Sequence, residues 1–296
     1  MKKASRLLFA SLATFGFVGS AIAQDVPTEP DPNAPAPDGT VADPNAMPDP
    51  NAVVPAGKWP RSVILRPLTL PAGVFLVGAD ITNFTSSFFD PALIRVLAGY
   101  GITDDIELAF AHYAFPTSDV GQGAILAQVG VKLARGAMGG KLEAIGRAQI
   151  GYNLAAEIDL TTGDTSGAVS PLGLGVHVQY NVTDKIALIT PGNQLTIGLD
   201  PNFINLAIPV GVGFQATPEL YVQLDTNIAT INIKDSATAV IFADTTPIAV
   251  TATYNVMPAL DVLAGLALDL TPAEPAGVGD TFAILIGARY YGGKLN

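Results

Sequence analysis

The segment YNVTDKIAL, residues 180–188, decides the fold because altered copies of it recur along the chain. The other copies are YGITDDIEL at 100–108, FQATPELYV at 214–222 and YNVMPALDV at 254–262. Each copy begins with an aromatic residue and continues, three residues later, with Thr-Asp, Thr-Pro or Met-Pro. Asp and Pro suit tight turns, Pro because its ring presets the φ angle of the first central position. The four copies therefore predict four turns of one kind.

The residues that lead into each turn alternate between two types. They read ALIRVLAGY (92–100), LGLGVHVQY (172–180), LAIPVGVGF (206–214) and TPIAVTATY (246–254), with aliphatic residues mostly at even positions. A period of two with one apolar face predicts β-strands. The alternation resumes after each turn without a change of parity, so each copy predicts a β-hairpin.

The spacing of the aromatic residues predicts further hairpins. Positions 100, 180, 214 and 254 suggest a hidden copy near 140, where the Gly-rich sequence RGAMGGKLEAIG stands at 135–146. One further period leads to FAILIGARYY at 282–291, a predicted terminal strand. The turns and the alternating segments together predict twelve strands, with ten or fourteen as alternatives. We place the strands at about 73–83, 92–101, 106–114, 123–134, 141–152, 171–181, 186–190 (or longer), 203–215, 219–229, 247–255, 260–269 and 281–291.

The N-terminal residues differ from the rest of the chain. Residues 1–23 have the charged end, apolar stretch and A-x-A site of a secretory signal, and its removal takes the formal net charge from −11 to −14. Residues 24–60 contain DPNA three times and are rich in Pro, which predicts a disordered linker. Residues 61–296 form the expected folded domain. A chain this acidic is an unsuitable partner for nucleic acid.

Composition favours a membrane protein. Charged residues make up 14% of the chain, against roughly 25% in typical soluble domains. Five short turns at one end, longer connections at the other and an even strand number are typical of transmembrane barrels. The fold class predicted is therefore all-β, a transmembrane antiparallel up-and-down β-barrel. The aromatic residues at the turn end of the apolar face form an expected girdle at the membrane interface: Tyr100, Tyr180, Phe214, Tyr254 and Tyr290.

Residues 72–291, with their YGxTD-type turns, resemble the porin-like outer-membrane β-barrels of Gram-negative bacteria. The resemblance implies an outer-membrane location, with the linker in the periplasm. It also implies outer-membrane lipid and the outer-membrane assembly machinery as partners. It specifies no substrate, and the oligomeric state stays open.

The face opposite the apolar one would line a lumen. Its polar residues include Gln215, Gln223 and Asp261. The candidates with the clearest role in the lining are Asp80, Arg95, Glu107, Lys132, Glu143, Arg147, His177, Gln179, Asp225 and Arg289. Mixed charges and amides suit the passage of small polar solutes. Alternatively, opposite charges pair across a narrow interior and give a closed, structural or anchoring barrel, because twelve strands lie between the filled eight-stranded and the open sixteen-stranded cases.

An enzyme, such as an outer-membrane hydrolase, is the third alternative. The chain has two histidines: His112 falls on the lipid-facing side of its strand and His177 points inward, without a serine nearby on its own strand face. No nucleophile–base pair, metal-ligand spacing or phosphate loop is recognisable, so we expect no enzyme, metal or cofactor. Pro209 and Pro247 within strand patterns predict bulges or strand ends.

Overall fold

The computed structural model covers the whole domain predicted to form strands, apart from several connections. The expectations for residues 1–23 and for most of the linker lie outside the described part. The described residues are 60–84, 92–115, 121–154, 157–158, 165–166, 169–199, 202–232, 239–241, 247–257, 259–270 and 282–293.

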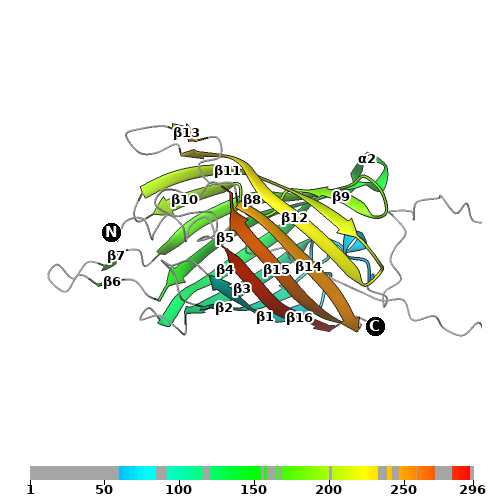
Figure 1. The fold of residues 1–296 in the computed structure, drawn as a ribbon, viewed down its shortest axis with the longest axis horizontal. Helices are drawn as coiled ribbons and strands as arrows, with labels where there is room; N and C mark the ends of the chain where they lie inside the picture. Colours follow the sequence, from blue (N-terminus) through cyan, green and yellow to red (C-terminus); the bar gives the residue numbers. More distant parts are fainter. Residues whose placement is uncertain are drawn as a thin grey trace, which may run out of the picture.

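The strands form one antiparallel sheet that closes into a barrel (Figure 1). Closure follows from two pairings, because β1 pairs with β16 as well as β2, and β11 pairs with β12. The wall strands are β1 (Val74–Phe84), β2 (Ala92–Gly101), β3 (Ile106–Phe115), β4 (Gly121–Gly136), β5 (Leu142–Asn153), β8 (Val169–Asn181), β9 (Ile186–Ile189) with β10 (Leu195–Leu199), β11 (Asn202–Gln215), β12 (Leu220–Asn232), β14 (Pro247–Met257), β15 (Leu260–Asp269) and β16 (Ala283–Gly293). Since β9 and β10 are two halves of one wall strand, the described residues build a twelve-stranded barrel, and the prediction is confirmed.

Smaller elements lie in the connections. The helical turn α2 (Ala137–Gly140) joins β4 to β5 and contains three residues with a positive φ angle, Met138, Gly139 and Gly140. This turn is the copy without an aromatic residue that the spacing predicted. The short strands β6 (Glu157–Ile158), β7 (Thr165–Ser166) and β13 (Ala239–Ile241) lie at the end of the barrel opposite α2 (Figure 1). No helix within the described ranges is both long and apolar enough to cross a membrane.

The threonine of the repeated motif closes the turn. The Oγ1 atom of Thr183 accepts hydrogen bonds from the backbone N–H groups of Lys185 and Ile186, at 3.2 and 3.0 Å. Thr217 does the same for Glu219 and Leu220. A hydroxyl that bonds the backbone two residues on fixes a tight turn locally, which explains why the motif recurs between strands.

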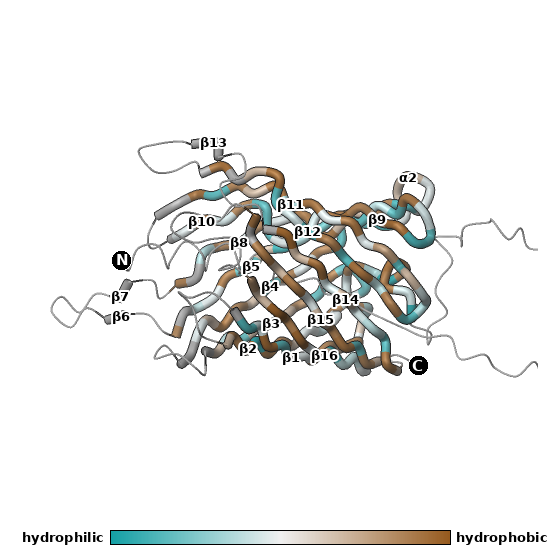
Figure 2. Tube along the Cα trace, in the orientation of Figure 1, coloured by the Kyte–Doolittle hydropathy of each residue, from teal (hydrophilic) through white to brown (hydrophobic). Residues whose placement is uncertain are grey.

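The two faces of the wall differ sharply in exposure. On β2, Arg95 is 6% exposed and the next residue, Val96, is 52% exposed. β16 shows the same alternation, since Ile286 is 63% exposed and Arg289 is buried. Apolar residues thus face outward on these strands, and apolar and polar positions mix along the strands in Figure 2. An apolar outer surface around a polar inner one is what a barrel in lipid requires.

Two prolines lie where the wall is irregular. The β11–β12 register shifts between Ala207 and Pro209, and Pro247 is the first residue of β14. Both positions agree with the predicted bulge and strand end, because Pro has no N–H group to donate to the ladder.

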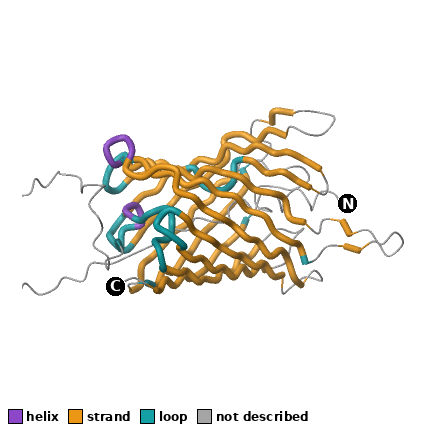
Figure 3. Tube along the Cα trace, turned by 180° about the vertical axis from the view of Figure 1, so that it is seen from behind, coloured by secondary structure: helices purple, strands orange, loops and turns teal. Residues whose placement is uncertain are grey.

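The chain before β1 lies inside the barrel rather than in its wall. Residues 61–72, called the internal segment below, contain the short 3₁₀ helix η2 (Val63–Leu65). η2 and the adjoining loop lie within the end of the barrel that carries the short turns, as Figure 3 shows in purple and teal. We call this end the short-turn end. The sequence predicted no such segment.

Candidate functional site: the polar lumen and its internal segment

Half of the residues of the internal segment are buried, although much of their surroundings is polar. Ile64 is 1% exposed, Arg66 2% and Thr69 1%, and Leu68 and Leu70 are also buried. The segment contains Pro67 and Pro71, which have no N–H group, and it follows no strand pattern. Its remaining backbone groups therefore need partners from the barrel wall.

From Ile64 to Ala72, every second residue of the internal segment donates a hydrogen bond to a side chain of the barrel. The backbone N–H of Leu68 donates to Glu143 Oε1 at 3.2 Å, and that of Leu70 donates to Glu107 Oε2 at 3.0 Å. The series continues at both ends: Ile64 N to Gln215 Oε1 (3.3 Å), Arg66 Nη1 to Asp261 Oδ2 (3.3 Å) and Ala72 N to Asp104 Oδ1 (3.0 Å). Four of these five acceptors are carboxylates, which accept stronger hydrogen bonds than neutral groups do.

Wall side chains also donate to carbonyl groups of the segment. Gln179 Nε2 lies 2.7 Å from the carbonyl oxygen of Ile64, and Asn181 Nδ2 lies 3.3 Å from the same atom. Arg147 Nη2 lies 3.5 Å from the carbonyl oxygen of Leu68. The lumen thus contacts the internal segment as it would an extended ligand, through both donors and acceptors.

The most enclosed ion pair of the site joins Arg66 to Asp261. Both side chains are 1% exposed, and Asn255 Nδ2 donates to the other carboxylate oxygen of Asp261 at 3.2 Å. Burial lowers the pKa of Arg66 and the Asp261 carboxylate partly offsets this effect, so that the resulting pKa is about 10. The guanidinium therefore stays protonated at neutral pH, and a full charge of the segment is held by the wall.

Several of the predicted lining residues are paired within the wall. Arg95 Nε lies 2.9 Å from Asp80 Oδ2, and the two residues are directly opposite on β2 and β1. Arg147 connects three strands, since its guanidinium lies 3.4 Å from Glu107 Oε1 and 3.2 Å from His177 Nδ1.

Asp225, Arg289 and Lys132, also predicted to line the lumen, have different surroundings. Asp225 accepts two hydrogen bonds from Gln223 Nε2, at 2.7 and 2.9 Å. Arg289 is buried and lies opposite Asp261 in the β15–β16 register. The amine of Lys132 lies at the short-turn end, where it contacts the carbonyl oxygen of Asp104 and the carboxylate of Asp105.

Glycines provide the space that these side chains need. A Cβ atom at Gly211 would overlap the Asp225 carboxylate, and one at Gly213 would overlap the Tyr221 ring. At Gly130 it would lie 2.8 Å from Glu107 Oε1. The small residues on the inner face thus give room to long polar side chains from neighbouring strands.

The predicted aromatic girdle lies on the outer surface at the short-turn end. About half of the surface of Tyr100, Phe214, Tyr254 and Tyr290 is exposed, and Tyr180 is half-buried. Phe75 joins them, since its ring centroid lies 6.2 Å from that of Tyr290. Their role as a membrane girdle stays a prediction.

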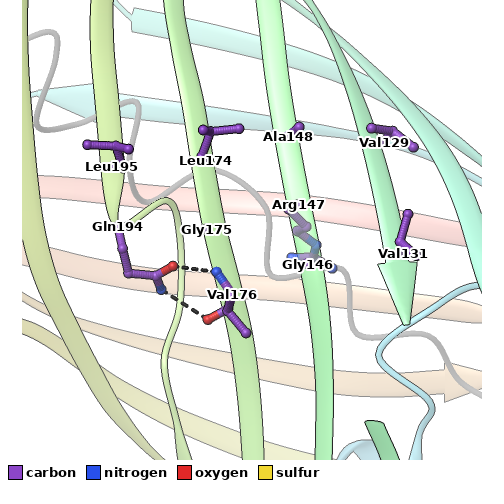
Figure 4. A pocket seen from close by; sticks show the side chains of 10 residues that line it. All are labelled: Val129, Val131, Gly146, Arg147, Ala148, Leu174, Gly175, Val176, Gln194 and Leu195. Carbon is purple, nitrogen blue, oxygen red and sulfur yellow. Dashed lines mark hydrogen bonds between the residues drawn. The ribbon is translucent and has the colours of Figure 1, made fainter. Parts of the chain in front are cut away.

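The wall is interrupted between β9 and β10, and a groove lies beside this point. The groove has a volume of about 500 Å³ and is lined mainly by outer residues of β4, β5 and β8, such as Val131, Ala148 and Leu174 (Figure 4). Gln194, from the interruption, also lines the groove. Within the described residues, no three His, Asp or Glu side chains gather closely enough to hold a metal ion.

The described strands form a closed, twelve-stranded antiparallel β-barrel with an apolar outer face and a polar inner face, which is the architecture that the resemblance implied. No family model matches the chain, and no curated protein matches its sequence. Among solved structures, the NanC porin is 9% identical with a TM-score of 0.49, and the KdgM porin is 8% identical with a TM-score of 0.47; each match covers 73% of this chain and 98% of the other. An outer membrane channel from Pseudomonas putida F1 is 14% identical with a TM-score of 0.45, over 76% and 97% of the two chains.

Proposed function

We propose that this protein is a pore for the passive or weakly selective passage of small polar solutes across the outer membrane of a Gram-negative bacterium. The short turns would then face the periplasm. The observation that carries the proposal is the contrast between the two faces of the wall: the inner one presents charged and amide side chains such as Arg95, Arg147 and Gln223, while the outer one is apolar. A polar lining of this kind lowers the cost of moving a hydrated solute through the barrel.

The test is single-channel conductance of the full-length protein in a planar bilayer. Refolded protein whose gel migration shifts on heating provides a folded sample. We expect discrete, stable current steps. Silence from a demonstrably folded barrel would overturn the proposal.

A second function, a closed structural or anchoring barrel, is favoured by one specific observation. The internal segment lies in the short-turn end and is bonded to side chains from β3, β5, β8, β11 and β15. In this case, the linker that precedes the segment would hold a partner. Co-purification of a partner that is lost when residues 24–59 are replaced by a Gly-Ser chain of equal length would support this function.

A further inference from the structure

The hydrogen bonds between the internal segment and the wall hold the segment in the short-turn end of the barrel. They also indicate which chemical groups this part of the lumen can bind. We infer that residues 61–72 occupy, within their own chain, a site for cationic solutes with N–H donors, and that such solutes displace the segment. This inference rests on the proposed function and names the class of solute that the lumen takes.

The first step of the argument is the kind of atom that the wall presents. Toward the internal segment it presents three carboxylates on strands, Glu107 on β3, Glu143 on β5 and Asp261 on β15. Each accepts a hydrogen bond from the segment, and all three are buried or half-buried. Arg147 and Asn255 of the wall also contact Glu107 and Asp261, but each carboxylate loses one donor if the segment leaves, and Asp261 loses its paired guanidinium. Loss of such partners in a buried site is costly, so the site favours an occupant with N–H groups or positive charge.

The second step is that the segment itself supplies the charge. The guanidinium of Arg66 donates from Nη1 to Asp261 Oδ2 and from Nη2 to the carbonyl oxygen of Arg61, and the residue is 2% exposed. Planar guanidinium groups match carboxylates in both charge and geometry. A free solute that carries a guanidinium offers Asp261 the same donors, and Asn255 would keep Asp261 oriented, since it donates to the other carboxylate oxygen.

The third step concerns how the segment could leave. It is continuous with the wall at Val74, the first residue of β1, and Gly73 has a φ of 80°, which favours glycine. Gly73 also donates its N–H to the carbonyl oxygen of Gly101 at 2.8 Å. A release that pivots at Gly73 leaves the β1–β2 and β1–β16 pairings unchanged, so the barrel stays closed on itself while its interior is vacated.

The experiment uses a thiol as a reporter of release. The chain contains no cysteine, so Thr69→Cys in the full-length protein introduces a unique label site. Thr69 is 1% exposed and its hydroxyl donates to the carbonyl oxygen of Asp104, so a maleimide reaches the thiol only when the segment leaves. The rate of labelling is measured on folded barrel at constant ionic strength, with L-arginine or with L-citrulline. These two solutes have similar shape and the same α-ammonium and α-carboxylate groups, but only arginine carries a positive charge on its side chain.

We expect arginine to raise the labelling rate in a saturable manner and citrulline to leave it nearly unchanged. Asp184→Cys, at an exposed turn position, reports any direct effect of arginine on the labelling reaction. Equal responses to both solutes, or no response to either, would overturn the inference.

A matched pair of variants tests the role of Asp261. In the Thr69→Cys background, Asp261→Asn should raise the basal labelling rate by roughly tenfold to a hundredfold, since a hydrogen bond to a charged group contributes about this factor. It should also remove the response to arginine. Glu219→Gln breaks an ion pair of the same segment, with Arg61, in which both side chains are about one-third exposed. This control should change the rate by less than about fivefold.

The labelling and conductance experiments distinguish a failure of this inference from a failure of the proposed function. A barrel that labels in response to arginine but carries no current would retain the binding site and overturn passage. A conducting barrel whose labelling ignores arginine would retain passage and overturn this inference.

Discussion

Asp80 and Arg95 illustrate how single charged residues are held inside the barrel. They lie directly opposite each other on adjacent strands, about 7% of each side chain is exposed, and three hydrogen bonds join them. A Cβ atom at Gly287, on the other side of Asp80, would lie 2.7 Å from the Asp80 Cβ, so this side of the pair is closely packed. The pair is thus a neutral unit, and each member depends on the other.

Removal of one member should therefore cost more than removal of both. We expect Arg95→Gln to destabilise the barrel by about 3–5 kcal/mol, because it leaves the Asp80 carboxylate buried without its counter-charge. The double variant Asp80→Asn, Arg95→Gln should recover most of this loss. The measurement is the urea midpoint for loss of the folded, faster-migrating gel band. A double variant as unstable as the single one would contradict this account.

At the scale of the element, the interrupted strand β9–β10 shows how a break in the wall is repaired. Side chains replace the missing backbone ladder along β8: Gln194 accepts from the Val176 N–H at 2.5 Å, and its Nε2 donates to the Val176 carbonyl at 3.1 Å (Figure 4). Thr190 repeats this role, since its hydroxyl accepts from Val178 N and donates to the Val176 carbonyl. Unpaired backbone groups are costly in a wall that faces lipid, as proposed for this barrel, so these side-chain hydrogen bonds should stabilise the interrupted strand.

Gln194→Ala should destabilise the barrel at this interruption. The Val176 N–H then loses its acceptor, which costs about 1–3 kcal/mol, and its hydrogen exchange should accelerate. Asn193→Ala is the matched control, because it removes an amide from the same loop and leaves the bonds between Gln194 and Val176 intact. Thermal conversion of the folded gel band measures stability. Equal effects of the two substitutions would show that the side-chain repair contributes nothing.

The contrast between the turns and the internal segment shows what the sequence could predict. Alternation and the turn threonines are local signals, and the 40-residue spacing is a repeat visible in the sequence itself, so the twelve strands and their turns were predicted within a few residues. The interruption of the seventh strand was not predicted, although Pro191-Gly192 is a local turn signal. The internal segment was missed because its partners are distant: Arg66 bonds a residue 195 positions away and Ile64 one 151 positions away. No periodicity in a single sequence encodes such contacts.

At the scale of the whole molecule, the balance of charge in the lumen determines what the proposed pore would prefer. Within the predicted lining, the residues that we expect to set selectivity are four carboxylates, Asp80, Glu107, Glu143 and Asp225, and four cations, Arg95, Lys132, Arg147 and Arg289. These eight residues do not all have partners of the same kind in the structure. Glu107 and Glu143 also contact the internal segment, while the amine of Lys132 is bound at the turn that contains Asp104 and Asp105. Fixed charges of this kind set the ion preference of a pore.

Replacement of all four cations by glutamine should shift the pore toward cations, because the four carboxylates then act without counter-charges. The measurement is the reversal potential under a KCl gradient, which we expect to move toward the potassium equilibrium value. The double variant Asp80→Asn, Arg95→Gln keeps the net charge and should leave the reversal potential unchanged. Lys132→Gln alone should have the smallest effect of the single substitutions, since its amine lies at the turn rather than across the lumen. An unchanged reversal potential in the fourfold variant, measured on folded channels, would show that these residues do not determine selectivity.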